Sequence, residues 1–248
     1  MNPLRSLFGG PPREKRVGSR LLGLIGGVSP ESTVIYYRLM NERARERFGG
    51  QHSVNALLWT LDYGVMIKLY EAGDWDAFRA EVAAGGRALK AAGADLLVIT
   101  SNTTHLAAEA LAEATGLEVF HMLDVLAEEM RAAGVKKPLL LGTPVVMTGP
   151  FYLSSLAARY DGEVATPDEA DRAETGRIIL DELVEGVVSD ASRERYKAMI
   201  AKAKADGADG VILGCTELCM ILSQEDTDLP VFDTTALHAR AAFAAAHG

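Results

Sequence analysis

The stretch Asp206–Glu217, DGADGVILGCTE, decides the fold of this 248-residue chain, because a related stretch, Ala92–Thr103 (AGADLLVITSNT), occurs 114 residues earlier. Two more pairs follow the same order: Arg20–Gly27 (RLLGLIGG) with Lys136–Thr143 (KKPLLLGT), 116 residues apart, and Leu117–Phe120 (LEVF) with Leu229–Phe232 (LPVF), 112 apart. Three matches in one order at nearly one spacing indicate that the chain consists of two related halves.

Short apolar runs alternate with amphipathic helical segments along the whole chain, which predicts an α/β fold with parallel sheets. The predicted strands are Leu21–Ile25, Asn55–Thr60, Asp95–Thr100, Leu117–Phe120, Pro138–Leu141, Gly210–Leu213 and Pro230–Phe232. Helices are predicted at Val34–Ala44, Trp75–Ala92, Thr103–Thr115, Leu123–Ala133, Asp168–Val187 and Ala191–Ala205. We expect 20–118 plus 226–248 to form the first half, 119–225 the second, and 1–19 a flexible arm.

Composition restricts the class of partner. The chain has 34 acidic and 25 basic residues and a net charge of −9, which argues against a nucleic acid or an anionic membrane surface as partner. It has neither an apolar run of the roughly 18 residues that a membrane span requires nor a signal-peptide pattern. Its two cysteines, Cys215 and Cys219, suggest reduced thiols rather than a disulfide scaffold, and hence a cytoplasmic protein. The oligomeric state is open, a homodimer being the commonest assembly.

The repeat places Ser101 opposite Cys215, each directly after a buried strand. Open α/β sheets bind ligands at the carboxyl ends of their strands. If the two halves face one another, both side chains approach one ligand from opposite sides, as removal and return of a proton on opposite faces of a carbon requires. Helix N-terminal amides after Cys215 could lower the pKa of its thiol; the alternative is an inert core cysteine.

Polar groups around these two residues suit an oxyanion. Asn102 and Thr103 begin a predicted helix, where they could bind a carboxylate or simply cap the helix. The loop after Gly26 and Gly27 lacks the spacing of a nucleotide-binding motif, and Cys-x-x-x-Cys alone is not a metal pattern, so no metal is predicted.

These loops resemble the cofactor-independent aspartate/glutamate racemase family, closest to its bacterial broad-specificity or L-selective amino-acid racemase branch. The resemblance runs from about Leu21 to Ala246 and includes GGVSPESTVIYYRLMNE, NTTH, LGT followed by FY, GCTE and LPVFDTTALHA. It implies two pseudo-symmetric Rossmann-like halves, an active-site cleft between them and a pair of cysteines that act as acid and base, with no cofactor.

Carried over residue by residue, the resemblance implies that Cys215 is the second catalytic cysteine. Ser101 stands where most members have the first, which departs from the pattern and predicts unequal rates for the two enantiomers. The substrate-binding residues implied are Gly27, Val28, Asn102, Thr103, Thr143 and Thr216.

We therefore expect a racemase of a small, acidic amino acid such as aspartate or glutamate. A lysine that some members use for the distal carboxylate has no clear counterpart, since the corresponding helix carries Glu174, Glu182 and Glu185 beside Arg172 and Arg177. Two alternatives stay open: a one-cysteine decarboxylase, isomerase or lyase of a small dicarboxylic acid, and a binding protein without catalytic activity.

Overall fold

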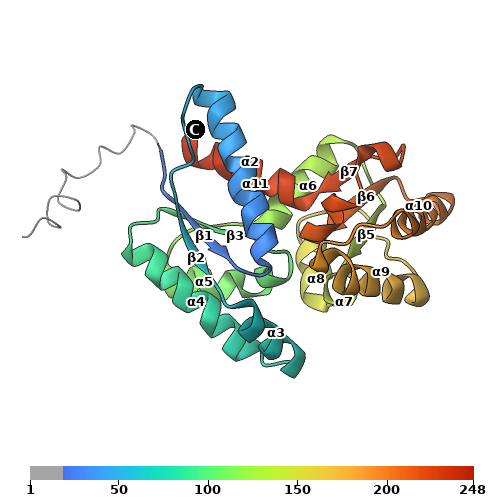
Figure 1. Ribbon diagram of the computed structural model, residues 1–248, viewed down its shortest axis with the longest axis horizontal. Coiled ribbons are helices and arrows are strands. Elements are labelled where there is room, and N and C mark those ends of the chain that lie inside the picture. The colour runs from blue at the N-terminus through green and yellow to red at the C-terminus, as the bar shows by residue number, and fades with distance from the viewer. Residues whose placement is uncertain (1–18) are drawn as a thin grey trace, which may run out of the picture.

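The computed structural model describes residues 19–248, which form two α/β halves lying beside one another (Figure 1). Residues 1–18 of the predicted arm lie outside the described part of the chain. From the N-terminal side the elements are β1 Leu22–Gly26, α2 Pro30–Phe48, β2 Ala56–Thr60, α3 Tyr63–Ala72, α4 Trp75–Ala91, β3 Leu96–Ile99, the 3-10 helix η1 Thr103–Ala107, α5 Ala108–Thr115, β4 Val119–Phe120 and α6 Met122–Ala132. They continue with β5 Pro138–Gly142, α7 Pro144–Thr148, α8 Pro150–Ala157, α9 Glu169–Asp181, η2 Leu183–Glu185, α10 Asp190–Ala205, β6 Gly210–Gly214, η3 Thr216–Met220, η4 Gln224–Asp226, β7 Val231–Asp233 and α11 Thr234–His247.

The two sheets confirm the internal repeat. The first has the strand order β2-β1-β3-β4 and the second β5-β6-β7, and every pairing is parallel. The repeat therefore matches β1, β3 and β4 with β5, β6 and β7, in the same order. β2, the remaining strand of the first sheet, has no full strand as its counterpart in the second half. Its place beside β5 is taken by an isolated bridge between Leu139 and Ala165. The predicted α/β class with parallel sheets is confirmed.

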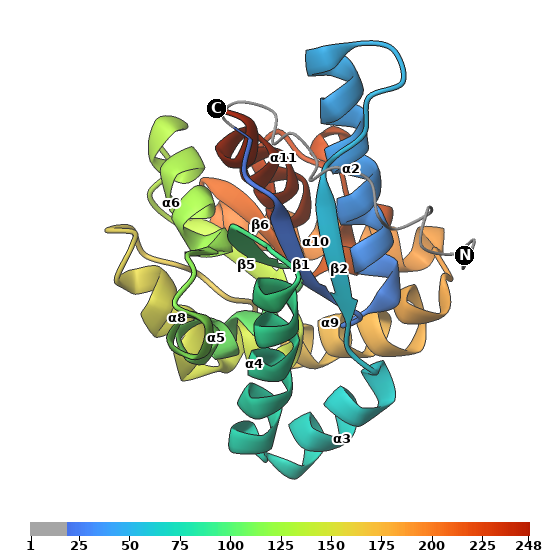
Figure 2. The same ribbon diagram turned by 90° about the vertical axis from the view of Figure 1, so that its left-hand side faces the viewer.

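The strands β1, β3, β5 and β6 are buried along their whole length because helices cover both faces of the sheets (Figure 2). In the first half, Leu22 and Leu24 pack with α2 and α11, while Ile25 packs with α4 and α5. The second half repeats this arrangement: α9 and α10 cover one face of its sheet, and α6 and α8 cover the other.

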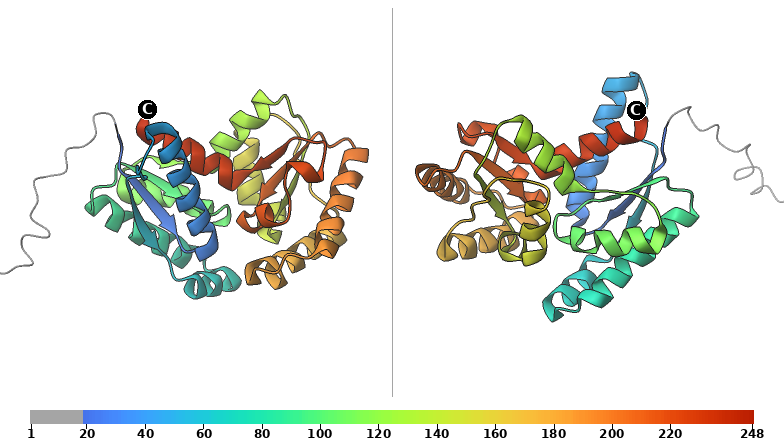
Figure 3. Two further views of the ribbon diagram at one scale, coloured as in Figure 1. Left: turned by 45° about the horizontal axis from the view of Figure 1, so that its top comes forward. Right: turned by 180° about the vertical axis from the view of Figure 1, so that it is seen from behind.

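The strand pairings change the expected division of the chain at two places. β4 pairs with β3 in the first sheet, although 119–225 was assigned to the second half. β7 pairs with β6 in the second sheet, although 226–248 was assigned to the first half. α11 then packs on the first half, and Figure 3 shows it running from one half to the other. An apolar run predicts a strand but does not specify its partner, and the chain in fact crosses between halves at His121 and at Thr234.

Two predicted helices are shorter than expected. The helix predicted over 168–187 ends at Asp181 and is followed by η2. The helix predicted after Cys215 is the short 3-10 turn η3, which lacks the length that a helix-dipole effect on the thiol would need. None of the helices within residues 19–248 combines the length and the apolar character needed to cross a membrane.

Gly27 brings the end of β1 against the end of β2. Its φ is +92°, a conformation that L-residues avoid, and a Cβ at this position would overlap the carbonyl oxygen of Leu61. The Leu61 amide donates to the Gly26 carbonyl at 2.9 Å, so neither backbone can move away without losing this hydrogen bond. Gly27 is therefore required for packing between backbones.

We expect Gly27→Ala to lower the free energy of unfolding by about 3 kcal/mol, because backbone strain and overlap add. Gly73→Ala is the matched control: Gly73 also has a positive φ, 65°, but has no atom near its missing Cβ. It should cost only about 1 kcal/mol. Urea unfolding followed by circular dichroism measures both, and equal costs would contradict the proposed backbone contact.

Candidate active site

A cavity of about 160 Å³ lies between the carboxyl ends of the two sheets. Loops after β1 and β3 of the first half and after β5 and β6 of the second contribute to its lining, together with α3, α4, α9 and η2. The predicted site residues that line it are Val28, Ser101, Asn102, Thr103, Thr143, Cys215 and Thr216. Gly27, predicted to bind substrate, does not line the cavity and lies at the contact between β1 and β2.

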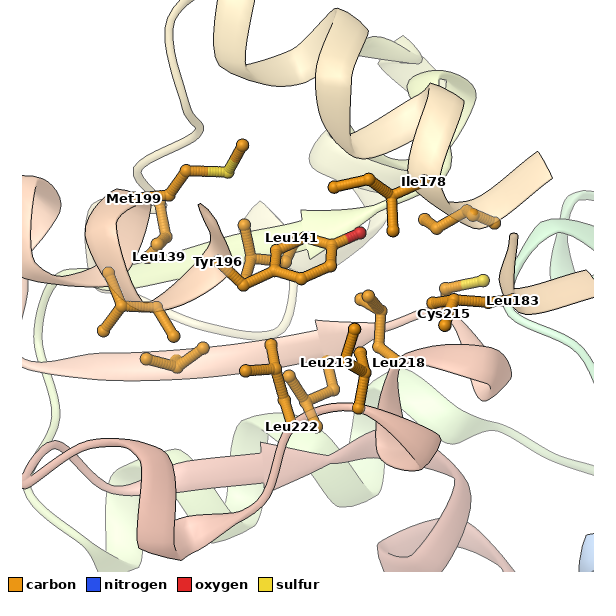
Figure 4. Close-up of a cluster of buried hydrophobic side chains, with 14 of the residues drawn as sticks. Leu139, Leu141, Ile178, Leu183, Tyr196, Met199, Leu213, Cys215, Leu218 and Leu222 are labelled. Atoms are coloured by element: carbon orange, nitrogen blue, oxygen red, sulfur yellow. The ribbon is translucent and has the colours of Figure 1, made fainter. Parts of the chain in front are cut away.

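Cys215 lies where the apolar core of the second half meets the cavity. Its side chain is packed at one end of the core cluster that includes Leu183 and Leu218 (Figure 4). Only 8% of the residue is exposed. Its Sγ donates a hydrogen bond to Glu217 Oε2 at 3.0 Å, so the thiol has an acidic partner two residues further along the chain.

Glu217 accepts three hydrogen bonds in the buried end of the cavity. Besides the thiol of Cys215, the hydroxyl of Thr216 donates to Oε2 at 2.6 Å and that of Ser29 donates to Oε1 at 2.8 Å. Three converging donors are the pattern of an ionised carboxylate, which only accepts. Ser29 belongs to the first half and Glu217 to the second, so this group also joins the two halves.

Burial and then the negative charge of Glu217 raise the pKa of Cys215 well above the ordinary value of a thiol. The sequence-based expectation was the opposite: helix amides after Cys215 were expected to lower this pKa. The pKa of the thiol is raised rather than lowered for two reasons. η3 is too short to act as a helix dipole, and the carboxylate of Glu217 contacts the sulfur. The thiol is therefore protonated near pH 7.

Ser101 is fixed through its backbone. His105 donates from Nδ1 to the Ser101 carbonyl at 2.7 Å, and its Nε2 accepts from the Met122 amide at 3.2 Å, which fixes the tautomer. Burial lowers the pKa of His105 to about 4, so the ring is neutral near pH 7. The Ser101 hydroxyl oxygen accepts from the Thr104 amide at 3.4 Å. His105 is thus a packed residue that positions the Ser101 loop.

Asn102 uses its side chain to join the two halves. Its Nδ2 donates to Thr234 Oγ1 at 3.0 Å, and its Oδ1 accepts from the hydroxyl of Tyr152 at 3.0 Å. Thr234 in turn donates to the Leu213 carbonyl at 2.8 Å. The amide predicted to bind a substrate carboxylate therefore has a structural role as well.

Thr143, unlike Asn102, has a side chain without a hydrogen-bond partner among the described residues. Its Oγ1 is buried, and the residue lines the cavity. A buried hydroxyl without a partner is costly, and a ligand that accepts or donates here would remove that cost. The hydroxyl of Thr216, by contrast, already donates to Glu217.

The remaining lining is apolar. Among the residues that the structure describes, no Lys, Arg or His lines the cavity, and Glu217 is its one Asp or Glu. No group of three or more His, Cys, Asp and Glu side chains within residues 19–248 is placed to hold a metal ion.

Comparison with known proteins identifies the family. Residues 25–242 match the sequence profile of the Asp/Glu/hydantoin racemases. The chain belongs to this family. Its fold is thus that of a racemase family, whose members are isomerases, and the predicted family is confirmed.

Three relatives show how far the similarity extends. The structure of a proposed Asp/Glu racemase from Yersinia pestis is 40% identical, covers 92% of this chain and 99% of its own, and superposes with a TM-score of 0.87. An aspartate racemase homologue from Pyrococcus horikoshii OT3 is 31% identical, covers 92% and 100%, and has a TM-score of 0.82. The broad specificity amino-acid racemase RacX from Bacillus subtilis (strain 168) is 20% identical and covers 89% of this chain and 95% of its own.

The sequence patterns did not reveal the roles of Glu217 and Ser29. For Glu217 there was a usable signal, its place two residues after Cys215 in GCTE. Ser29 gave no signal, because its contact with Glu217 joins residues 188 positions apart.

In a Cys219→Ala background, which leaves one thiol, we expect alkylation of Cys215 by iodoacetamide to have a pH midpoint above the ordinary value of about 8.5. Glu217→Gln should lower that midpoint, because it removes the charge that disfavours the thiolate. Glu185→Gln, which removes an exposed carboxylate outside the cavity, is the control and should leave it unchanged. A midpoint that rises in Glu217→Gln would show that the carboxylate assists ionisation instead.

Proposed function

We propose that the chain racemises an amino acid without a cofactor, with Cys215 and Ser101 exchanging the α-proton on opposite faces of the substrate. The observation that supports this most is that the two residues, equivalent in the repeat, line one cavity from two different sheets. A substrate carbon between them would have a proton acceptor on one face and a proton donor on the other.

Cys215 is the base in this proposal. Its proton leaves to solvent by way of Glu217, whose Oε2 lies 3.0 Å from the sulfur. A substrate ammonium group beside Glu217 would offset the negative charge that raises the thiol pKa, so binding would favour the thiolate. The thiolate then takes the α-proton: the C–H bond breaks, an S–H bond forms, and the electron pair stays on the α-carbon and its carboxylate.

Charge that develops on the substrate carboxylate needs donors fixed in advance. Thr143 suits this role because its buried hydroxyl has no partner among the described residues. Thr103 lines the cavity beside Ser101 and contributes a second hydroxyl. Asn102 and Thr216 contribute less, because their side chains already bond to protein groups.

Ser101 completes the reaction on the other face. Its O–H bond breaks as a new C–H bond forms, and the serine oxygen recovers a proton from water. A hydroxyl is a far weaker acid than a thiol, so proton transfer at Ser101 limits inversion, and it limits both directions alike because enantiomers have equal free energy. Exchange of the α-hydrogen without inversion needs Cys215 alone for one enantiomer and Ser101 alone for the other. Strongly unequal rates of α-hydrogen exchange for the two enantiomers follow.

The alternatives differ in what the cavity must hold. A decarboxylase, isomerase or lyase of a dicarboxylic acid needs two anion sites, yet no cationic side chain lines the cavity among the described residues, and Glu217 would repel a second carboxylate. This favours an amino acid over a dicarboxylate. A binding protein without chemistry would bind amino acids and exchange no proton. The acidic amino acid expected from the sequence would bring the same second carboxylate and would also lack a cationic partner among the described lining residues.

Deuterium uptake from solvent into the α-position tests the two residues. Cys215→Ala should reduce exchange at least about 100-fold, because it removes the competent base. Ser101→Cys should raise deuterium uptake by the slower enantiomer at least about 10-fold, since a thiol is the stronger acid. Mass spectrometry of the L- and D-forms of each amino acid in a panel measures both. Exchange that survives Cys215→Ala would exclude Cys215, and an unchanged Ser101→Cys would exclude Ser101 from the second face.

Thr143→Val tests the carboxylate site. It should raise KM about 10-fold through loss of one hydrogen bond to a charged group, without lowering stability, because the lost hydroxyl has no protein partner. Thr235→Val is the matched control: it removes another buried hydroxyl without a described partner, outside the cavity, and should leave KM unchanged. Equal effects of the two substitutions on KM would contradict a role for Thr143 in binding.

A further inference from the structure

We infer that the site selects an α-amino acid with an aliphatic or thioether side chain, such as leucine or methionine, rather than an acidic one. The inference rests on the proposed racemase function and adds the class of side chain. It depends on the lining of the cavity away from Cys215, which comes from helices instead of strand ends.

One helix lines the cavity with a face of aromatic and aliphatic side chains that carries no charge. Tyr63, Met66, Ile67 and Tyr70 of α3 all line it, and their spacing of three, four and seven residues from Tyr63 places them on one side of the helix. Lys68 is exposed and does not line the cavity, since it lies well round the helix from this face. The basic side chain of α3 is therefore directed away from a bound substrate.

The second half supplies a matching apolar wall. Ile179 and Leu180 of α9 and Val184 of η2 line the cavity across from α3, and Phe78 of α4 adds an aromatic ring. Leu180 is 52% exposed and lines the cavity, so its apolar surface is available to a bound side chain. An aliphatic substrate side chain would bury it and gain about 25 cal/mol for each Å² of apolar surface removed from water.

Within residues 19–248, no cationic side chain lines the cavity to pair with an acidic substrate side chain. Arg177 of α9 is held by Glu174 at 2.8 Å and by Glu182 at 2.9 Å, and Arg172 donates to the Pro167 carbonyl at 2.6 Å. Neither arginine lines the cavity. A distal carboxylate would lose water without gaining a cation, a cost that burial of an unpaired charge makes large.

The polar end of the cavity fits the common part of an amino acid. Glu217 offers a negative charge to the ammonium group, and Thr143 offers an unpartnered hydroxyl to the carboxylate. The volume of about 160 Å³ is that of a site for one small molecule. Residues at strand ends would thus bind both the ammonium group and the carboxylate of the substrate. The substrate side chain would then extend between α3 and α9.

The test compares two readouts on the intact protein. Isothermal calorimetry measures binding of L-leucine, L-methionine, L-aspartate and L-glutamate, and solvent deuterium uptake measures their turnover. We expect leucine and methionine to exceed aspartate and glutamate at least about 10-fold in affinity and in kcat/KM, the discrimination an apolar pocket gives. Leu180→Lys, at an exposed position, should reduce this ratio about 5-fold by supplying a cation and removing apolar contact.

Val187→Lys is the control, because it adds the same charge at a residue that is 51% exposed but does not line the cavity. It should leave the ratio within about 2-fold at physiological salt, where charges more than about 8 Å apart are screened. Tighter binding or faster turnover of aspartate or glutamate in the wild type overturns the inference and leaves the racemase proposal standing. Tight binding of leucine without exchange supports the inference and overturns the racemase proposal. Binding of none of the four overturns both.

Discussion

The hydroxyl of Thr234 is the point on which the geometry of the site depends. It accepts a hydrogen bond from Asn102, directly after Ser101, and donates to the carbonyl of Leu213, two residues before Cys215. One oxygen thus ties the carboxyl end of β3 to that of β6, and with them the two residues proposed to flank the substrate. Tyr152 fixes the other side of the Asn102 amide, so the link has no freedom to rotate.

The hydrogen bond between Ser29 and Glu217 is the second link between the halves. It also bears on the proposed proton transfer, because Glu217 contacts the thiol of Cys215. Glu217 holds the first half through Ser29 and the thiol of Cys215 through its other oxygen. While nothing offsets its charge, the carboxylate keeps the thiol protonated and therefore unreactive toward oxidants and electrophiles. A cationic group from the substrate changes that balance, so the same carboxylate would bind the ammonium group and permit ionisation of the thiol.

The apolar runs and the repeat were enough to predict the strands, the parallel sheets and the meeting of Ser101 and Cys215 at one cavity, because carboxyl ends of parallel strands meet at one edge. What it could not predict depends on contacts between distant residues. Local sequence patterns do not specify which distant segments come into contact. This applies to the sheets that β4 and β7 join, to the hydrogen bond from Ser29 to Glu217 and to the hydrogen bonds of the Asn102 side chain. The apolar wall of α3 was also hidden, since an amphipathic helix has the same pattern whether its apolar face meets a core or a cavity.

The two halves are equivalent in backbone and unequal in chemistry. The spacing of 114 that relates Ser101 to Cys215 also relates Thr103 to Glu217, so the carboxylate partner of the thiol has only a hydroxyl as its counterpart. Ser101 therefore lacks both the acidity of a thiol and an adjacent carboxylate to move its proton; the contact of its hydroxyl among the described residues is a long one from the Thr104 amide. The halves thus differ at two equivalent positions, and both differences weaken proton transfer at Ser101. A site built in this way transfers protons efficiently on the Cys215 face alone, and the enantiomer that exchanges faster is the one that presents its α-hydrogen to that sulfur.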